Sequence, residues 1–171
     1  MPGPWHDFYM LLGTASAALV ALLFVAASVG AGLIDPARST ATRTYMSPII
    51  FHYTCVLFVS LMTLVPGMTG RLLAVIVALL ALAGIGFSVA VLIGVVRSAA
   101  SDTADRFGYG AGPLAAYAAA LIAAGFLWTH APAGPYILAG ALVLLLLINI
   151  RNAWDLTITF ARRRTGGPPQ G

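Results

Sequence analysis

The sequence contains no lysine and no glutamate, so its nine basic residues are all arginine and its five acidic residues are all aspartate. Charged residues make up 8% of the 171 residues and hydrophobic residues 60%, with a mean hydropathy of +0.95. A soluble domain carries about a quarter charged residues, so this composition excludes a water-soluble globular protein. The positive charges lie in short loops and one terminal run rather than along a stripe, which excludes nucleic acid as a partner.

Cysteine is also scarce, since Cys55 is the only one. This excludes an internal disulfide and any multi-cysteine metal or iron–sulfur site. The sequence has no Gly-rich phosphate loop, no His-Glu-x-x-His and no Gly-x-Ser-x-Gly. Cys55 lies one turn from His52, as a nucleophile and its base would, but a small apolar packing residue is the simpler interpretation. Nothing in these residues supports an enzymatic activity, and no cofactor is predicted.

Long apolar runs dominate what remains. Crossing a hydrocarbon core of about 30 Å takes about 20 mostly apolar residues in a helix. Five stretches are long enough, at residues 8–34, 46–65, 72–96, 109–128 and 136–160. In the second, Ser47 and Pro48 fit a helix cap and a first-turn proline. We therefore predict an all-α bundle of five transmembrane helices, formed by a single domain over residues 1–164, and a disordered Gly/Pro-rich tail over residues 165–171.

The distribution of arginine predicts the orientation of this bundle. With five spans, seven arginines share one face and Arg71 lies on the other; the seven are Arg38, Arg43, Arg97, Arg106, Arg162, Arg163 and Arg164. Basic loops stay in the cytoplasm, so we expect the amino terminus outside and the carboxyl terminus inside. The first ten residues lack a positive n-region, so we expect the first helix to be retained rather than cleaved.

Polar residues interrupt the cytoplasmic half of the last span. Its Arg151 and Asp155 are four residues apart and can pair along the helix. Counting residues places His52 of the second span at about the same depth, together with Ser28, Ser88 and Tyr117. We therefore predict an inward-facing polar cluster; its members are His52, Asn149, Arg151, Asn152 and Asp155. Alternatively, the last helix lies further outward and Arg151 extends to the cytoplasmic headgroups.

Small residues are dense in the first helix, which includes Gly13, Ala17, Ala21 and Gly30. Such residues allow helix backbones to approach closely. We expect this helix to lie at the centre of the bundle or to form an oligomer interface.

At the opposite face, His6 and Asp7 precede the first helix and His130 follows the fourth. If those helices are neighbours, two imidazoles and a carboxylate could bind a divalent metal ion or sense pH. The alternative is two solvated histidines at the membrane interface.

Three segments carry a family resemblance: Trp5-His6-Asp7-Phe8-Tyr9, Gly13-Thr14-Ala15-Ser16-Ala17 and Ile150-Arg151-Asn152-Ala153-Trp154-Asp155. The chain resembles an uncharacterised family of small, multi-spanning bacterial inner-membrane proteins. The resemblance implies the fold and a bacterial inner-membrane location, and no activity.

Two functions fit these residues. The first is an oligomeric channel or permease for a small ion or solute, with the polar cluster setting selectivity or gating. The second is a non-catalytic accessory or assembly subunit that docks onto a larger membrane complex through its small-residue helices. The expected partners are the lipid bilayer and either further copies of the chain or that complex.

Overall fold

A computed structural model describes residues 4–31, 39–97 and 107–165, and the regular secondary structure of these residues is entirely helical. The described residues form five long helices and one π-helical turn. In order, these are α1 (Pro4–Ala31), α2 (Ser39–Leu64), α3 (Gly70–Arg97), the π-helical turn η2 (Phe107–Ala111), α5 (Gly112–Trp128) and α6 (Ala133–Thr165). The remaining residues, including 166–171 of the predicted tail, lie outside the described residues.

Within the described residues, five helical stretches are long and apolar enough to cross a membrane, which agrees with the five predicted; one of them joins η2 and α5. The candidate spans are Trp5–Ser28, Ser47–Leu64, Gly70–Gly94, Phe107–Trp128 and Ala133–Asp155. The second predicted span agrees with the structure, but the predicted helix cap at Ser47 and first-turn proline at Pro48 are wrong. The second helix begins at Ser39, so Pro48 lies inside it instead of in its first turn. The polar residues before Pro48 are helical, but they do not extend the apolar stretch. The start of the helix was therefore missed, because it was predicted from the start of that stretch.

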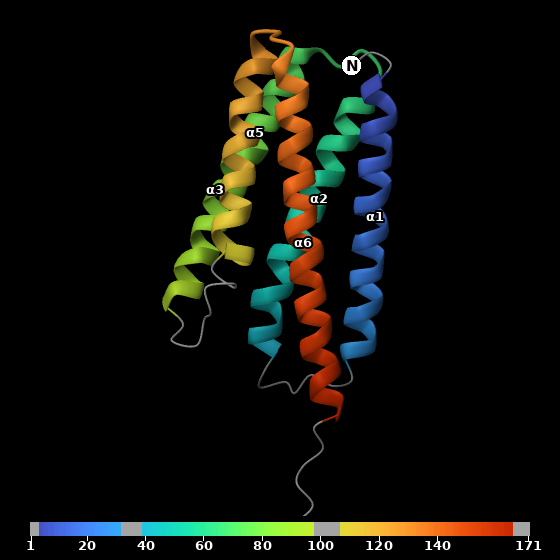
Figure 1. Cartoon of the computed structure of the whole chain (residues 1–171), viewed down its shortest axis with the longest axis vertical. Helices are drawn as coiled ribbons and strands as arrows, with labels where there is room; N and C mark the ends of the chain where they lie inside the picture. Colours follow the sequence, from blue (N-terminus) through green and yellow to red (C-terminus); the bar gives the residue numbers. More distant parts are fainter. Residues whose placement is uncertain (1–3, 32–38, 98–106, 166–171) are drawn as a thin grey trace, which may run out of the picture.

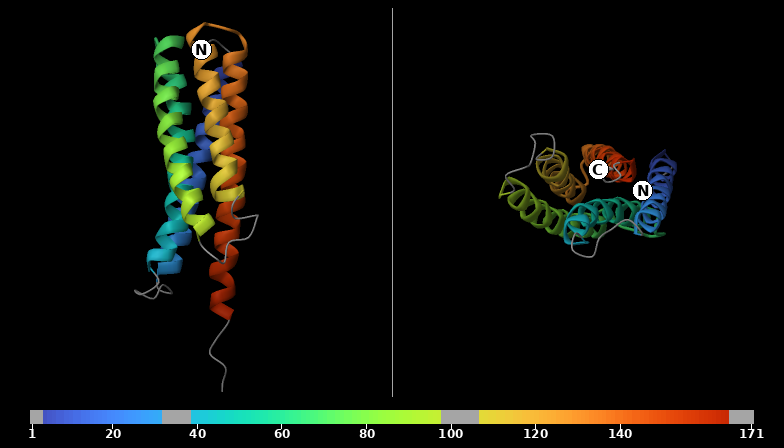
Figure 2. Two further views of the ribbon diagram at one scale, coloured as in Figure 1. Left: turned by 90° about the vertical axis from the view of Figure 1, so that its left-hand side faces the viewer. Right: turned by 90° about the horizontal axis from the view of Figure 1, so that it is seen from below.

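The long helices run along one axis of the molecule, with α1 beginning at the upper end of Figure 1 and α6 ending at the lower end. Seen along this axis, α1, α2 and α3 form one row, and α5 and α6 lie against it (Figure 2). The α2–α3 turn and the α5–α6 connection are both at the upper end (Figure 1). We use upper and lower in this sense below. Because the number of spans is odd, the first helix begins and the last helix ends at opposite ends of the bundle.

Small residues bring α3 and α5 together. The two helices pack closely and both carry buried alanines, at Ala74 and Ala81 of α3 and at Ala116, Ala120 and Ala123 of α5. Without larger side chains between them, the two backbones can approach closely.

The first helix is not central, which corrects that part of the prediction. It lies at the edge of the bundle, where it packs mainly on α2 and only lightly on α6 (Figure 2). About a fifth of its most apolar window is buried (22%), against half of that of α2 (50%). The small residues of α1 therefore pack mainly against α2. Four large apolar side chains of α1 are exposed: Leu11, Leu22, Phe24 and Val25. The alternative role, an oligomer interface, stays a prediction.

The upper end of α5 closes with a Schellman cap. The amide of His130 donates to the carbonyl of Leu127 (3.2 Å), and the amide of Ala131 donates to that of Phe126 (2.9 Å). This pattern needs a left-handed backbone at the residue after the helix, which is usually glycine. His130 takes that position with φ of 58°, and it is the only non-glycine residue with positive φ in the described chain.

Candidate functional site

In the interior of the bundle, a buried hydrogen bond joins α2 to α5. His52 Nδ1 lies 2.8 Å from the hydroxyl oxygen of Tyr117, and both side chains are buried. A Cβ at Gly84 of α3 would overlap the Tyr117 ring. Glycine at this position therefore lets the phenol reach across α3 to the imidazole. Tyr117 belongs to the interior site, as its predicted depth suggested.

The thiol of Cys55 lies beside the same hydroxyl, within hydrogen-bonding range of Tyr117. It is buried, and the apolar residues around it include Val59, Ala81 and Leu142. The predicted packing role and this weak polar contact are compatible. His52 and Cys55 thus contact one shared partner, Tyr117.

Several polar atoms in the interior have no hydrogen-bond partner within the described part of the chain. They are His52 Nε2, Tyr53 Oη, Ser60 Oγ, Ser88 Oγ and Asn149 Oδ1. They come from α2, α3 and α6, and all lie inside candidate spans. Asn149 is bonded only through its amide nitrogen, which donates to the Leu145 carbonyl at 2.6 Å. Unpaired polar atoms are costly inside a membrane, so they distinguish this interior from an ordinary apolar core. We call His52, Ser88, Tyr117 and Asn149 the interior polar cluster.

Asn152 is buried as well, but its side chain has a structural role. Its amide nitrogen donates to the carbonyl of Gly108 at 2.7 Å, and the Tyr109 hydroxyl donates to the Asn152 carbonyl at 3.3 Å. Both partners are in η2. These bonds attach the π-helical turn to α6 where the fourth span begins.

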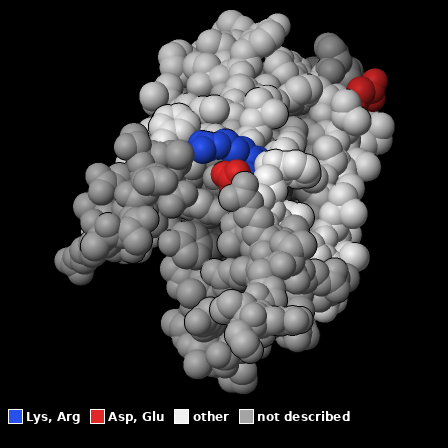
Figure 3. Space-filling model, turned by 60° about the horizontal axis from the view of Figure 1, so that its bottom comes forward, with Lys and Arg blue, Asp and Glu red and all other residues white. Residues whose placement is uncertain are grey.

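Arg151 and Asp155 lie outside the interior. Arg151 Nε is 3.9 Å from Asp155 Oδ2, so the predicted pairing along the helix is present. However, the two side chains are 48% and 50% exposed. Figure 3 shows a basic and an acidic side chain together on the surface near the lower end. The predicted cluster is therefore divided: His52, Asn149 and Asn152 are buried, and the ion pair is on the surface.

The rotation of α6 explains this division. Asn149 is fully buried and Asn152 bonds to η2, whereas the Arg151 and Asp155 side chains are about half exposed, although the Arg151 guanidinium still lies near Gly108 of η2. Of the other residues predicted at this depth, Ser88 is buried but Ser28 is exposed and donates to its own helix at Phe24. Depth was predictable by counting residues. The direction of each side chain was not.

At the upper end, the residues of the predicted metal site are separated into two groups. His6 Nδ1 lies 3.2 Å from Asp7 Oδ1 on an exposed part of α1. His130 is in the α5–α6 connection. Among the described residues, no group of three or more His, Cys, Asp or Glu side chains could hold a metal ion. The structure therefore does not assemble the three predicted ligands.

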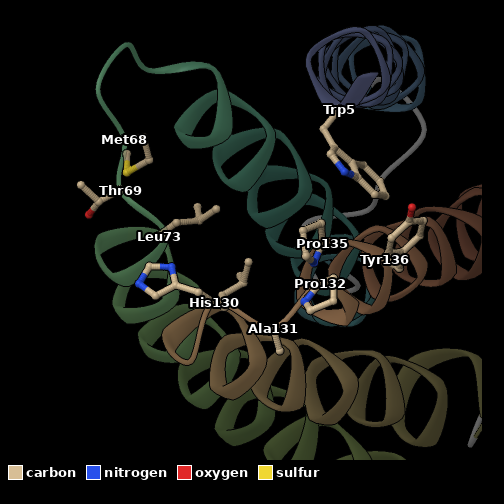
Figure 4. Close-up of a pocket in the computed structure, with 11 residues that line it drawn as sticks. Trp5, Met68, Thr69, Leu73, His130, Ala131, Pro132, Pro135 and Tyr136 are labelled. Atoms are coloured by element: carbon tan, nitrogen blue, oxygen red, sulfur yellow. The ribbon is translucent and has the colours of Figure 1, made fainter. Parts of the chain in front are cut away.

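A pocket of about 680 Å³ opens at this end instead (Figure 4). Sequence reasoning did not find it, because it depends on three chain segments that meet only in the folded protein. Its walls come from the start of α1, the α2–α3 turn and the α5–α6 connection; the lining residues include Trp5, Met68, Thr69, Leu73, Leu127, His130, Pro135 and Tyr136. We call this the upper pocket.

No protein-family model, no curated protein and no solved structure matches this chain. Function is therefore inferred from the geometry of the interior polar cluster and of the upper pocket.

Proposed function

We propose that this protein is a channel or permease that carries a small ion or solute across the bacterial inner membrane, with its amino terminus outside. One observation supports this proposal above others. Buried polar atoms from three helices have no partner in the described structure. Because each such atom is costly in a membrane, we infer that they interact with water or with the transported species during passage.

Protons are the species that this interior is best suited to handle. An imidazole has one proton site on each ring nitrogen, so it can accept a proton at one nitrogen and release the other. His52 has Nδ1 on the Tyr117 hydroxyl and Nε2 without a partner. A proton taken up at Nε2 can thus leave from Nδ1 toward Tyr117, whose hydroxyl both accepts and donates. Ser88 and Asn149 are further buried polar residues of the interior, each with an unpaired oxygen.

The surface ion pair has no part in this passage. Arg151 and Asp155 are about half exposed, whereas His52 is buried. Asn152 is also assigned a structural role, because its amide is occupied by Gly108. The proposal therefore rests on His52, Tyr117, Ser88 and Asn149.

Proton flux in vesicles tests the proposal. The purified protein is reconstituted into phosphatidylethanolamine and phosphatidylglycerol vesicles that contain a pH-sensitive dye, and a potassium gradient with valinomycin drives proton entry. We expect the dye to respond faster than in empty vesicles. His52→Asn keeps an amide near the position of Nδ1 but cannot titrate, so it should reduce the flux to the background rate. Tyr117→Phe keeps the ring and should slow the flux strongly.

The matched control is His6→Ala, which removes an exposed histidine at the upper end and should leave the flux unchanged. Circular dichroism and size-exclusion profiles establish that each variant is folded. Parental flux in His52→Asn would contradict the assigned proton path. Silent vesicles, both for protons and for a panel of small ions and solutes, would reject transport and favour the accessory-subunit alternative.

A further inference from the structure

The upper pocket has two chemically different ends. Thr69 and His130 are at one end, beside the start of α3, and Trp5 and Tyr136 are at the other (Figure 4). The two aromatic rings pack edge to face, with their centroids 4.8 Å apart. Between the ends, the lining is apolar and includes the buried Leu73 and Leu127. Such a pocket fits an elongated molecule with one polar and one apolar end.

The polar end contains a histidine where the backbone favours glycine. His130 occupies the left-handed position of the Schellman cap, and a side chain there has a steric cost that glycine avoids. At the neighbouring Gly70, a Cβ would lie only 3.3 Å from His130 Nδ1. The cap does not need a side chain at position 130, yet the residue there is histidine. Position 70, where a side chain would crowd that imidazole, is glycine. Strained positions of this kind are concentrated at functional sites.

Two features of the polar end favour a hydrogen-bond acceptor. Thr69 Oγ1 already accepts from the amide of Leu72 at 3.2 Å, which leaves its hydroxyl proton to donate. The amino end of α3 adds the positive end of a helix dipole. None of the described lining residues is acidic. The polar end therefore suits a hydrogen-bond acceptor, and the helix dipole favours an anion over a cation.

From these features we propose that the upper pocket binds an amphipathic organic monocarboxylate. The carboxylate lies between Thr69 and His130, and a ring or other apolar body lies against Trp5 and Tyr136. This site is separate from the interior polar cluster, and the proposal holds whether or not the protein transports protons.

Calorimetric titration of the detergent-solubilised full chain with phenylpropionate tests the site. Phenylpropanamide and phenylpropylamine have the same ring and replace the carboxylate with a neutral or a cationic group. We expect binding in the order carboxylate, amide, amine. His130→Gly removes the imidazole and also relieves the strained backbone. It should bind phenylpropionate at least roughly tenfold more weakly, as expected for the loss of a hydrogen bond to a charged group, while its thermal midpoint stays equal or rises.

A matched pair of tryptophan variants tests the apolar end. Trp5→Leu removes a pocket wall, whereas Trp128→Leu removes an exposed tryptophan at the same end of the molecule that does not line the pocket. Binding should weaken only in Trp5→Leu. Equal affinity for the amide or the amine would overturn the carboxylate assignment. Parental affinity in His130→Gly, or no binding of any probe to the parent, would overturn the site.

Discussion

At Gly84, the absence of a side chain lets Tyr117 reach His52. A Cβ there would overlap the phenol ring, whereas a Cβ at Gly86, two residues further along α3, would meet nothing within 4 Å. The two glycines share a helix and a local sequence. They differ only in the direction in which a methyl group would point, so they form a natural pair for comparison.

We predict that Gly84→Ala destabilises the protein by about 1–3 kcal/mol, the usual cost of overpacking a well-packed interior. Gly86→Ala should be neutral or slightly stabilising, because alanine is the better helix former. Thermal unfolding of both variants in the same detergent measures the difference. Equal midpoints would mean that Tyr117 can leave its position without cost.

The surface position of the ion pair sets the expected effect of Asp155→Asn. Exposed pairs contribute about 0–1 kcal/mol, whereas breaking a buried pair costs about 3–5 kcal/mol. With both side chains about half exposed and 3.9 Å apart, we predict a loss of less than about 1 kcal/mol. Chemical denaturation of the parent and the variant measures it. A loss near the buried-pair value would show that the pair is shielded from water in the membrane.

For single residues, the sequence predicted depth well and direction poorly. Counting along the spans placed His52 level with Tyr117 and Ser88, and the structure joins His52 to Tyr117. The same counting could not show that Arg151 points outward while Asn152 points inward. Those directions depend on how α6 is rotated against α2 and α5, and α6 is apolar around most of its upper half, so hydrophobicity alone does not fix its rotation.

At the scale of elements, η2 is the irregular start of the fourth span. Three glycines at its edges are buried, and Cβ atoms there would press on neighbours: Gly108 on Asn152, Gly110 on Leu92 and Gly112 on Ile148. The π-helical turn therefore needs both small residues and the Asn152 bond to stay against α6. The sequence predicted a fourth span at residues 109–128, but the π-helical turn at its start depends on this tertiary contact and could not be predicted.

We predict that Asn152→Ala loosens η2, because the Gly108 carbonyl loses its buried donor at a cost of about 1–3 kcal/mol. Amide hydrogen exchange at residues 107–111, followed by mass spectrometry, should become faster by a corresponding factor. Thr157→Ala is the control, since this exposed threonine bonds only within α6. If exchange in η2 is the same in both variants, the turn is held by packing alone.

For the whole molecule, the number of spans was predictable and the neighbours of each helix were not. Apolar length gave five crossings. The position of α1 at the edge of the bundle could not be predicted, because small residues favour close packing but do not indicate which helix is the neighbour. The seven arginines on which the predicted orientation depends have no described side chains, so orientation remains a prediction of the charge distribution.

A labelling experiment tests this orientation. We predict that a membrane-impermeant maleimide labels His6→Cys in intact cells, and labels Thr165→Cys only after the membrane is permeabilised. The native Cys55 is buried and supplies the background control. Labelling of Thr165→Cys in intact cells would reverse the orientation, and labelling at both positions would reject an odd number of spans.

The hydrogen bond between His52 and Tyr117 also has a consequence for biosynthesis. Its two partners are 65 residues apart, so at about 5–20 residues per second His52 leaves the ribosome several seconds before Tyr117. During that interval the α1–α2 hairpin carries a polar ring with no phenol to cover it. A nascent chain that stops before the fourth span therefore has the His52 imidazole without its Tyr117 partner.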